Sequence, residues 1–295
     1  KQEGVKTMKF DAVVGNPPYQ SMTNGGSDSG RAARQAAPIF NYFVEQAKML
    51  EPGYVSMIIP ARWYNGGIGL NAFRADMLND KHLTKLVDFA NSKDCFTTVD
   101  IGGGLCYFLW ERDHEDECLV INMNSGEQDA LRRSLNQYGN LFIRSNKAIS
   151  IIEKIRAKAD SFVDEMVSAI DTFGIPSKVR GHEEHEEGDI LLVHSDGANS
   201  SKTSYISRDV VTKNAHLIDK YKVRISILVP QNGEAGVKPE KGYRSMSTPH
   251  LVYPGQVDSF SYLNIGFFDN ETEAENFRKY MMCKLPRFMM RTTYS

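Results

Sequence analysis

The sequence predicts an α/β fold followed by a mixed α+β domain. Strand-like and helix-like segments alternate through the first half of the chain, which is typical of an open parallel sheet covered by helices. A short charged turn joins the last two strand-like segments of that half, and we expect them to form an antiparallel hairpin on the sheet edge. At about 150 residues per domain, the 295 residues suggest two domains, and a boundary near 145 divides the chain into 1–145 and 146–295.

The first domain begins with a short apolar strand. Further strands are expected at 54–59, 83–89, 101–110 and 118–123, after the first at 10–14. The Gly/Ser-rich stretch 20–37 is expected to be a mobile loop. A helix should then begin at Pro38, a residue suited to the first helical position. Its expected apolar stripe comprises Ile39, Phe43, Ala47 and Leu50, and that of the next helix comprises Leu70, Phe73 and Met77.

In the second domain we expect helices at the beginning and the end, with a set of short strands between them in the sequence. We expect a helix over 146–157 and a further helical stretch to about 170, and then strands at 190–194, 203–207, 222–229, 250–253 and 261–268. Asn270, with Glu273 three residues later, predicts the start of a last helix. Its expected apolar stripe comprises Ala274, Phe277, Met281, Leu285 and Phe288. Pro286 should kink or end this helix.

Composition narrows the classes of function. The net charge is −2, from 35 basic and 37 acidic side chains, which excludes an overall basic nucleic-acid binder but allows local basic patches. No run of 18 apolar residues predicts a membrane span. The four cysteines form no CxxC pair, so neither a zinc site nor a disulfide framework is expected, and a reducing, cytoplasmic setting fits. The segment 182–185 (HEEH) lacks the HExxH spacing, and a solvated acidic loop is favoured over a metal site.

The tetrapeptide Asn16-Pro17-Pro18-Tyr19 directly follows the first predicted strand and Gly15. Active sites of open α/β sheets lie at the carboxyl ends of strands. The two prolines remove two N–H donors, which leaves the Asn16 side-chain oxygen and the Pro17 carbonyl as acceptors for the hydrogens of an amino group. Tyr19 offers a flat face for stacking. The alternative is a purely structural Pro-Pro turn.

These residues resemble the catalytic motif of DNA adenine-N6 methyltransferases of restriction-modification systems. The helix 38–50, the strand and turn 53–64 and the segment 73–89 resemble the family's next three blocks, and 92–113 resembles the block that supplies a second aromatic side chain. The segment 247–277 is similar to the distal domain of some members. The resemblance implies a partial Rossmann-like class I methyltransferase sheet in 1–145 and a target-recognition domain in 146–295.

The resemblance also implies a mechanism. The target adenine would be flipped out of double-stranded DNA. Its amino group would donate to Asn16 and the Pro17 carbonyl, and Tyr19 and Phe96 would contact its faces. S-adenosylmethionine would provide the methyl group, without a metal. The family's Gly-rich cofactor loop precedes its catalytic motif, and only 15 residues precede Asn16, so we expect the cofactor site to lie largely upstream. The segment 101–104 (IGGG) is expected to pack closely or form a bulge. For Phe96, the alternative is a core aromatic.

Basic side chains in both halves are candidates for phosphate contacts, and ordinary surface charge is the alternative. The candidates are Arg31, Arg34, Lys178, Arg180, Lys241 and Arg244. The predicted function is thus a site-specific DNA adenine methyltransferase, with a nuclease domain or subunit as a further candidate partner. Two alternatives stay open: a non-catalytic DNA-binding or specificity fragment, and a methyltransferase acting on an amino group in RNA or protein.

Overall fold

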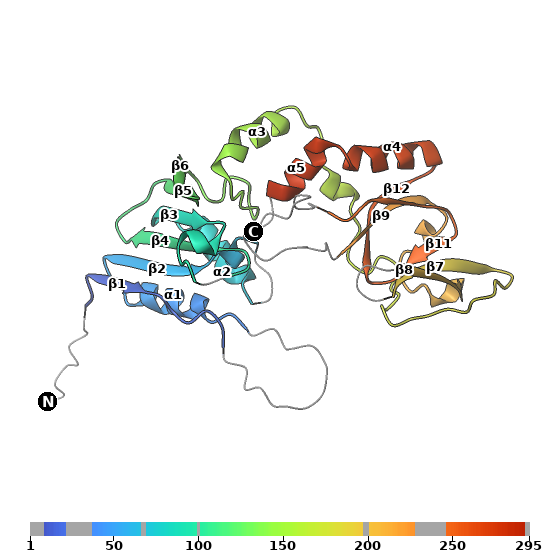
Figure 1. The fold of residues 1–295 in the computed structure, drawn as a ribbon, viewed down its shortest axis with the longest axis horizontal. Helices are drawn as coiled ribbons and strands as arrows, with labels where there is room; N and C mark the ends of the chain where they lie inside the picture. Colours follow the sequence, from blue (N-terminus) through green and yellow to red (C-terminus); the bar gives the residue numbers. More distant parts are fainter. Residues whose placement is uncertain are drawn as a thin grey trace. The chain divides into compact units, whose positions relative to one another are not determined.

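The computed structural model describes residues 9–21, 37–65, 69–98, 101–196, 201–227 and 246–292 (Figure 1). The chain forms two compact units, which divide within helix α3 (Asn146–Arg156), after residue 151. The first unit contains one large mixed sheet with helices, and the second contains two small sheets with helices. This arrangement confirms the expected α/β class with a following α+β part.

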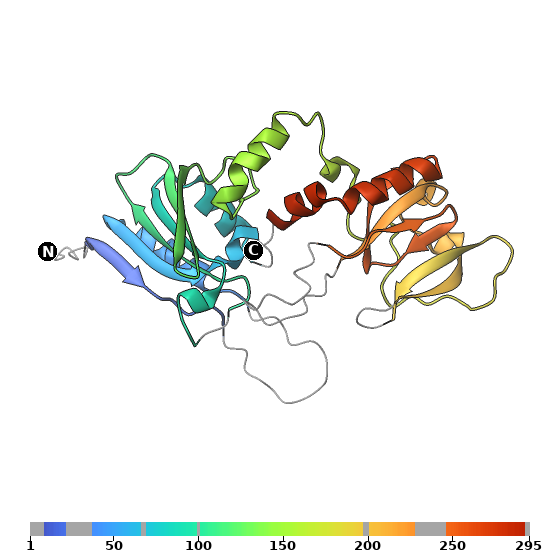
Figure 2. The ribbon, with the colours of Figure 1, turned by 45° about the horizontal axis from the view of Figure 1, so that its top comes forward.

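One six-stranded sheet forms the centre of the first unit (Figure 2), and its strands follow the order β1-β2-β4-β3-β5-β6 (Figure 1). Its strands are β1 (Ala12–Gly15), β2 (Tyr54–Pro60), β3 (Leu83–Phe89), β4 (Leu105–Glu111), β5 (Cys118–Asn124) and β6 (Glu127–Arg133). The pairs β1–β2 and β3–β5 are parallel, and β4 is antiparallel to both β2 and β3. Strands β1, β2, β3 and β5 therefore run in one direction, and their carboxyl ends share one edge of the sheet.

The edge hairpin exists, but it is not made of the two strands expected to form it. Strand β4 lies in the sheet interior between β2 and β3, and β5 pairs with β6 instead. The sequence of β4 is apolar on both faces, as its burial between two strands requires, whereas β6 (EQDALRR) is too polar to be recognised as a strand. Two 3-10 turns, η1 (Ala61–Asn65) and η2 (Ser92–Asp94), follow β2 and β3.

Two helices of this unit pack beside the sheet. The apolar stripe expected for α2 (Asn71–Asn79) is confirmed, since Leu70, Phe73 and Met77 are all buried. The stripe expected for α1 (Phe40–Met49) is wrong except at Ala47, because the buried apolar face carries Phe40 and Val44 together with Ala47. Phe43 and Leu50 are 45% and 50% exposed. Pro38 also precedes the helix, and its backbone pairs with Gln20 in an isolated β-bridge.

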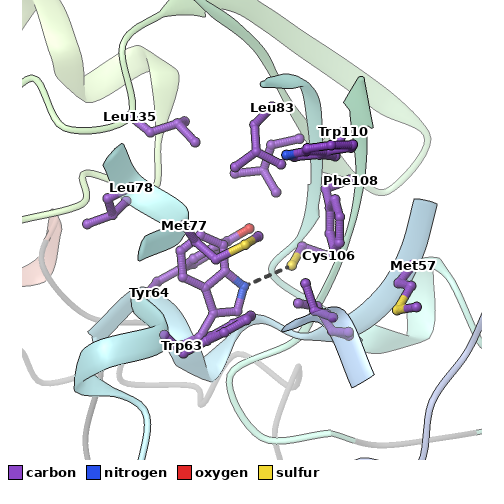
Figure 3. Close-up of a cluster of buried hydrophobic side chains, with 14 of the residues drawn as sticks. Met57, Trp63, Tyr64, Met77, Leu78, Leu83, Cys106, Phe108, Trp110 and Leu135 are labelled. Atoms are coloured by element: carbon purple, nitrogen blue, oxygen red, sulfur yellow. Dashed lines mark hydrogen bonds between the residues drawn. The ribbon is translucent and has the colours of Figure 1, made fainter. Parts of the chain in front are cut away.

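Aromatic and sulfur-containing side chains fill the core between the sheet and these helices (Figure 3). The ring of Trp63 meets those of Tyr64 and Phe73 edge-on, at centroid distances of 4.7 and 6.0 Å. The Trp63 Nε1–H donates to Cys106 Sγ at 3.4 Å, so the polar atom of this buried indole is satisfied. The turn η1 is thereby fixed to the neighbouring strand β4.

The second unit contains two three-stranded sheets, ordered β10-β9-β12 and β11-β7-β8. Their strands are β7 (Asp189–Ser195), β8 (Ser201–Ser207), β9 (Tyr221–Ser226), β10 (His250–Val252), β11 (Gln256–Asp258) and β12 (Tyr262–Phe268). The first sheet is antiparallel, and in the second β11 runs parallel to β7. The short strand β11 was not expected from the sequence, and the helical stretch expected before residue 170 is only the 3-10 turn η3 (Val163–Met166). Two further 3-10 turns are η4 (Arg208–Val210) and η5 (Ala215–Leu217).

The expected last helix is two helices, α4 (Glu271–Met281) and α5 (Lys284–Thr292). The side chain of Asn270 accepts a hydrogen bond from the Glu273 N–H at 2.9 Å, which confirms the predicted cap. Inside a helix, a proline ring clashes with the carbonyl group of the residue four positions earlier. For Pro286 that residue is Met282, the C-cap of α4. Pro286 itself lies in the first turn of α5, where proline is tolerated. Among the residues described above, no helix is long and apolar enough to cross a membrane.

A buried lysine distinguishes the core of the second unit. Lys222 is fully buried, and its Nζ donates to the carbonyls of Leu217, Ile218 and Lys220 at 3.3, 2.8 and 2.8 Å. Burial lowers the pKa of Lys222 to about 8. In the unfolded chain the pKa of this side chain is near 10.5. Between about pH 8 and pH 10.5 the unfolded state therefore binds more protons than the folded state. The stability of the unit should therefore rise with pH across this window.

We expect Lys222→Met to remove that rise, which has an upper limit of about 3 kcal/mol. The substitution should also lower the free energy of unfolding by roughly 1–3 kcal/mol near pH 10, because three buried carbonyls lose their donor. Calorimetric unfolding of the chain between pH 7 and 10.5 measures both effects. The exposed Lys202→Met is the matched control, and parallel pH profiles for Lys222→Met and the unsubstituted chain would contradict the assignment.

Candidate functional site

The sequence motif Asn16-Pro17-Pro18-Tyr19 begins directly where β1 ends at Gly15. It therefore lies at the edge of the sheet that the carboxyl ends of β1, β2 and β3 share. The segments 61–65, 92–98 and 101–104 reach the same edge, since they follow β2, follow β3 and precede the antiparallel β4. Ligands of open α/β sheets bind at this edge, so the topology brings the motif to the expected place.

The motif forms one wall of a cavity of about 380 Å³. Pro17 is buried, Tyr19 is half-buried against the hydrophobic core, and Asn16 and Pro18 are exposed. The Tyr19 carbonyl accepts from the Ile39 N–H at 3.2 Å, and the Ser21 N–H donates to the Ala37 carbonyl at 3.0 Å. These bonds fix the end of the motif to the segment that leads into α1.

Phe96 and Ile101 form a second wall of the same cavity. Both side chains are half-buried, and both belong to the segment between β3 and β4. The structure therefore brings Phe96 together with the four motif residues, as the sequence suggested. Ile101 was not expected in this role, and an isolated isoleucine beside three glycines carries no signal that would have identified it.

Burial raises the pKa of the Tyr19 hydroxyl to about 12, with further contributions from the thiols of Cys95 and Cys106. Tyr19 therefore keeps its proton at neutral and moderately alkaline pH. The ring presents an uncharged aromatic face to the cavity. Together the lining residues supply the acceptor oxygen of an amide, two proline rings, two aromatic rings and one aliphatic side chain.

This composition fits a flat, amino-bearing ring better than it fits S-adenosylmethionine. The volume lies in the range of small-molecule sites, roughly 300–1,000 Å³. None of the six described residues that line the cavity is acidic or basic. The hydroxyl and amino groups of the donor would need charged or polar partners, which these six residues do not provide beyond Asn16 and Tyr19.

Within the glycine-rich segment 101–104, the close packing that we expected occurs at Gly104. Gly104 has a φ of +79°, and a Cβ at this position would lie 2.1 Å from the Phe89 carbonyl oxygen. Its N–H donates to the Ile101 carbonyl at 2.9 Å, and its carbonyl accepts from the Ala61 N–H at 3.0 Å. Only glycine allows β4 to begin this close to the end of β3.

A buried ion pair lies behind this segment. The Arg144 guanidinium donates to Asp88 through Nη2–Oδ1 and Nε–Oδ2, both at 2.8 Å, and through Nη1 to the Gly103 carbonyl at 2.7 Å. The side chains are 12% and 3% exposed. Burial alone would lower the pKa of Arg144, but the adjacent Asp88 carboxylate outweighs it and the pKa is raised. Sequence reasoning missed this pair, although an aspartate inside the apolar strand LTKLVDF indicates a buried charge that needs a partner.

Among the described residues, no other candidate lines this cavity. Arg31, Arg34, Lys241 and Arg244 lie outside the described residues. Lys178 and Arg180 are exposed in the second unit. The Arg180 guanidinium donates to the Ser177, Val179 and Ser195 carbonyls at 2.7, 2.8 and 3.2 Å, so it also stabilises its own turn. In the segment 182–185, His182 Nε2 lies 2.6 Å from Asp189 Oδ2.

The first third of the chain is similar to a known family of proteins. Residues 1–96 match the family described as Eco57I restriction-modification methylase. An uncharacterized adenine-specific methylase of Mycoplasma pneumoniae is 39% identical over 135 residues, which are 43% of this chain and 31% of that protein. The match thus spans about a third of the length of this curated relative. These matches confirm the resemblance of the first part of the chain to adenine-specific restriction-modification methylases.

Two solved structures of restriction-modification proteins are also similar. The type I methyltransferase subunit from Streptococcus thermophilus is 12% identical, with a TM-score of 0.29, over 55% of this chain and 34% of that chain. The Type IIL enzyme MmeI, solved in complex with DNA, is 12% identical, with a TM-score of 0.39, over 88% of this chain and 41% of that chain.

The site's architecture predicts contrasting effects at two neighbouring glycines. Gly104→Ala should destabilise the first unit by several kcal/mol, because the added methyl group meets the Phe89 carbonyl and φ is positive. Gly102→Ala should change stability by less than about 1 kcal/mol, since a Cβ at Gly102 would have no atom within 4 Å and its φ is not in the left-handed region. Urea unfolding of both variants measures the difference, and equal effects would contradict the packing described.

Proposed function

We propose, from the match of residues 1–96 to the restriction-modification methylase family, that this chain is the base-capturing and target-recognition part of a site-specific DNA adenine methyltransferase. The observation that carries the proposal is the cavity in which the amide of Asn16 and the rings of Tyr19 and Phe96 converge at the carboxyl edge of the sheet. The product would be adenine methylated at N6, within a restriction-modification system. Double-stranded DNA is the proposed partner, and a nuclease domain or subunit is a further one.

The acceptors of the first wall suit the exocyclic amino group of adenine. An amino group has two hydrogens to donate, and the Asn16 side-chain oxygen and the Pro17 carbonyl can each accept one. The prolines offer no competing N–H donors at positions 17 and 18. Accepting both hydrogens favours the form in which the nitrogen lone pair is localised and available for the methyl group. The reaction then depends on position and polarisation, and needs no strong base.

The two aromatic rings suit the faces of the same base. Adenine inside a duplex is paired through its amino group, so it must leave the helix to reach this cavity. Unpairing and unstacking cost a few kcal/mol, and stacking on an aromatic ring returns about 1–3 kcal/mol per base. Tyr19 and Phe96, which both line the cavity, can together offset most of that cost.

The methyl donor of the proposed reaction is S-adenosylmethionine, whose sulfonium provides an electrophilic methyl group. Residues outside this cavity would hold it. The same chemistry would serve an amino group in RNA or protein. A chain that binds DNA without transferring a methyl group is the other alternative, and testing DNA, RNA and protein separately for methylation distinguishes these possibilities.

The decisive experiment is expression of the whole protein in a host that lacks adenine methylation, followed by sequencing that detects modified bases. We expect methylated adenine at one short recurring sequence. Methylation of RNA or protein without DNA methylation would overturn the proposal in favour of another substrate. Tight duplex binding without any modified base would favour the specificity fragment.

Asn16→Ala should lower methyl transfer by at least about 10²-fold, by analogy with the loss of one preorganised polar group at an active site. Duplex affinity should change little, because the amide contacts only the captured base. A labelled-methyl assay and a duplex-binding titration measure the two quantities. Asn124→Ala, at the exposed end of β5, is the matched control, and transfer at the unsubstituted rate by Asn16→Ala would refute the mechanism.

Tyr19→Ala should weaken capture of the extrahelical base by roughly 5- to 100-fold, since one stacking face is lost. Tyr19→Phe should retain most of the capture, because the ring remains and the raised pKa of the Tyr19 hydroxyl keeps it un-ionised at working pH. A duplex with 2-aminopurine at the methylated position reports capture as a rise in fluorescence. Tyr42→Ala, 59% exposed on α1, serves as the control, and an unchanged signal in Tyr19→Ala would argue against stacking.

A further inference from the structure

The wall formed by Phe96 and Ile101 is held neither by regular secondary structure nor by full burial of its two side chains. Both residues belong to the connection between β3 and β4. The described part of this connection contains no regular element except the short turn η2, which precedes Phe96. Both side chains are only half-buried, so packing alone does not fix their distance from the Asn16–Tyr19 wall. The hydrogen bonds of this connection must therefore set the width of the cavity.

One serine binds the connection at both ends of the wall. The Ser92 carbonyl accepts from the Phe96 N–H at 2.8 Å, and its Oγ accepts from the Ile101 N–H at 2.9 Å. Ser92 is 2% exposed, so these bonds are shielded from water. The side chain of Asp94, two residues on, accepts from the Ser125 N–H at 3.0 Å in the turn between β5 and β6.

The buried ion pair holds the end of the wall. Arg144 is held by Asp88 near the carboxyl end of β3, and its remaining Nη1 donates to the Gly103 carbonyl, two residues after Ile101. The backbone at Arg144 is itself fixed, because Asn122 Nδ2 donates to the Arg144 carbonyl at 3.0 Å and Asn122 Oδ1 accepts from the Asn146 N–H at 2.8 Å. The guanidinium thus connects β3 to the segment 101–104, and the backbone carbonyl of Arg144 connects it to β5.

We propose that Ser92 and Arg144 are positioning residues, which hold Phe96 and Ile101 at the distance from the Asn16–Tyr19 wall that admits one planar purine base. This inference rests on the proposed function for its ligand, and on the hydrogen bonds alone for its geometry. Neither side chain lines the cavity, so neither is expected to touch the base. Removing either should widen or loosen the cavity and leave the motif's acceptors in place.

Ser92→Ala removes the Oγ and keeps the carbonyl. We expect the amide of Ile101 to exchange its hydrogen about tenfold faster, the KM for DNA to rise several-fold, and kcat to fall less than KM rises, because a loose wall binds the base less well. Ser92→Thr retains the oxygen and should restore both values. Ser134→Ala is the matched control, since Ser134 also forms a side-chain hydrogen bond but lies beside the other, amino-end edge of the sheet.

Arg144→Gln alone would strand a buried carboxylate and could unfold the unit. The double variant Asp88→Asn with Arg144→Gln is neutral and tests the same contact. It should speed exchange in the segment 101–104 and raise the KM for DNA in the same sense as Ser92→Ala.

Hydrogen exchange on the full chain decides the geometry without any assumption about activity. Unchanged exchange at Ile101 in Ser92→Ala and in 101–104 in the double variant would overturn the proposal. Faster exchange with an unchanged KM for DNA would also overturn it, because the wall would then not control entry of the base. If the unsubstituted protein transfers no methyl group to DNA, the proposed function fails instead, and capture of 2-aminopurine replaces KM as the second measurement.

Discussion

The insertion of β4 between β2 and β3, antiparallel to both, is the constraint on which the first unit depends. A strand that runs against its neighbours begins at the edge where they end. The segment that precedes β4 therefore reaches the carboxyl ends of β1, β2 and β3, and Ile101 in this segment lines the same cavity as the motif that follows β1. With a parallel β4 the same segment would begin at the opposite edge, and the cavity would have only one wall.

Close packing at this edge has a chemical consequence for each wall. The first wall needs acceptors without donors, and consecutive prolines after a strand provide them while their fixed φ limits movement. The second wall needs an aromatic ring at a set distance, but Phe96 comes from an irregular connection that has no such stiffness. Buried hydrogen bonds from Ser92 and Arg144 provide it instead. Rigid backbone thus holds the first wall in place, and buried polar contacts hold the second.

The sequence predicted those features that depend on local pattern. Strands β1, β2 and β3, the helix α2 and the Asn270 cap follow from apolar periodicity and capping residues, and all agree with the structure. The pairing of β4 could not be predicted in this way, because strand partners are decided by contacts distant in sequence. The stripe of α1 was misassigned for a related reason: Phe43 and Phe40 are equally apolar, and only the position of the sheet decides which one is buried.

The candidate site also has a part that local sequence predicts and a part that depends on contacts distant in sequence. Asn16 to Tyr19 are adjacent in sequence, so their chemistry could be read directly, and their resemblance to methylases is confirmed over residues 1–96. Asp88 and Arg144 are 56 positions apart, and nothing local connects them.

A buried ion pair is a poor source of stability, since replacing such a pair by apolar side chains is often neutral or stabilising by about 1–4 kcal/mol. Stability alone therefore does not account for a charged pair at this position. The third hydrogen bond of Arg144, to the Gly103 carbonyl, requires a donor that an apolar side chain would lack, and it connects the pair to the wall of the cavity.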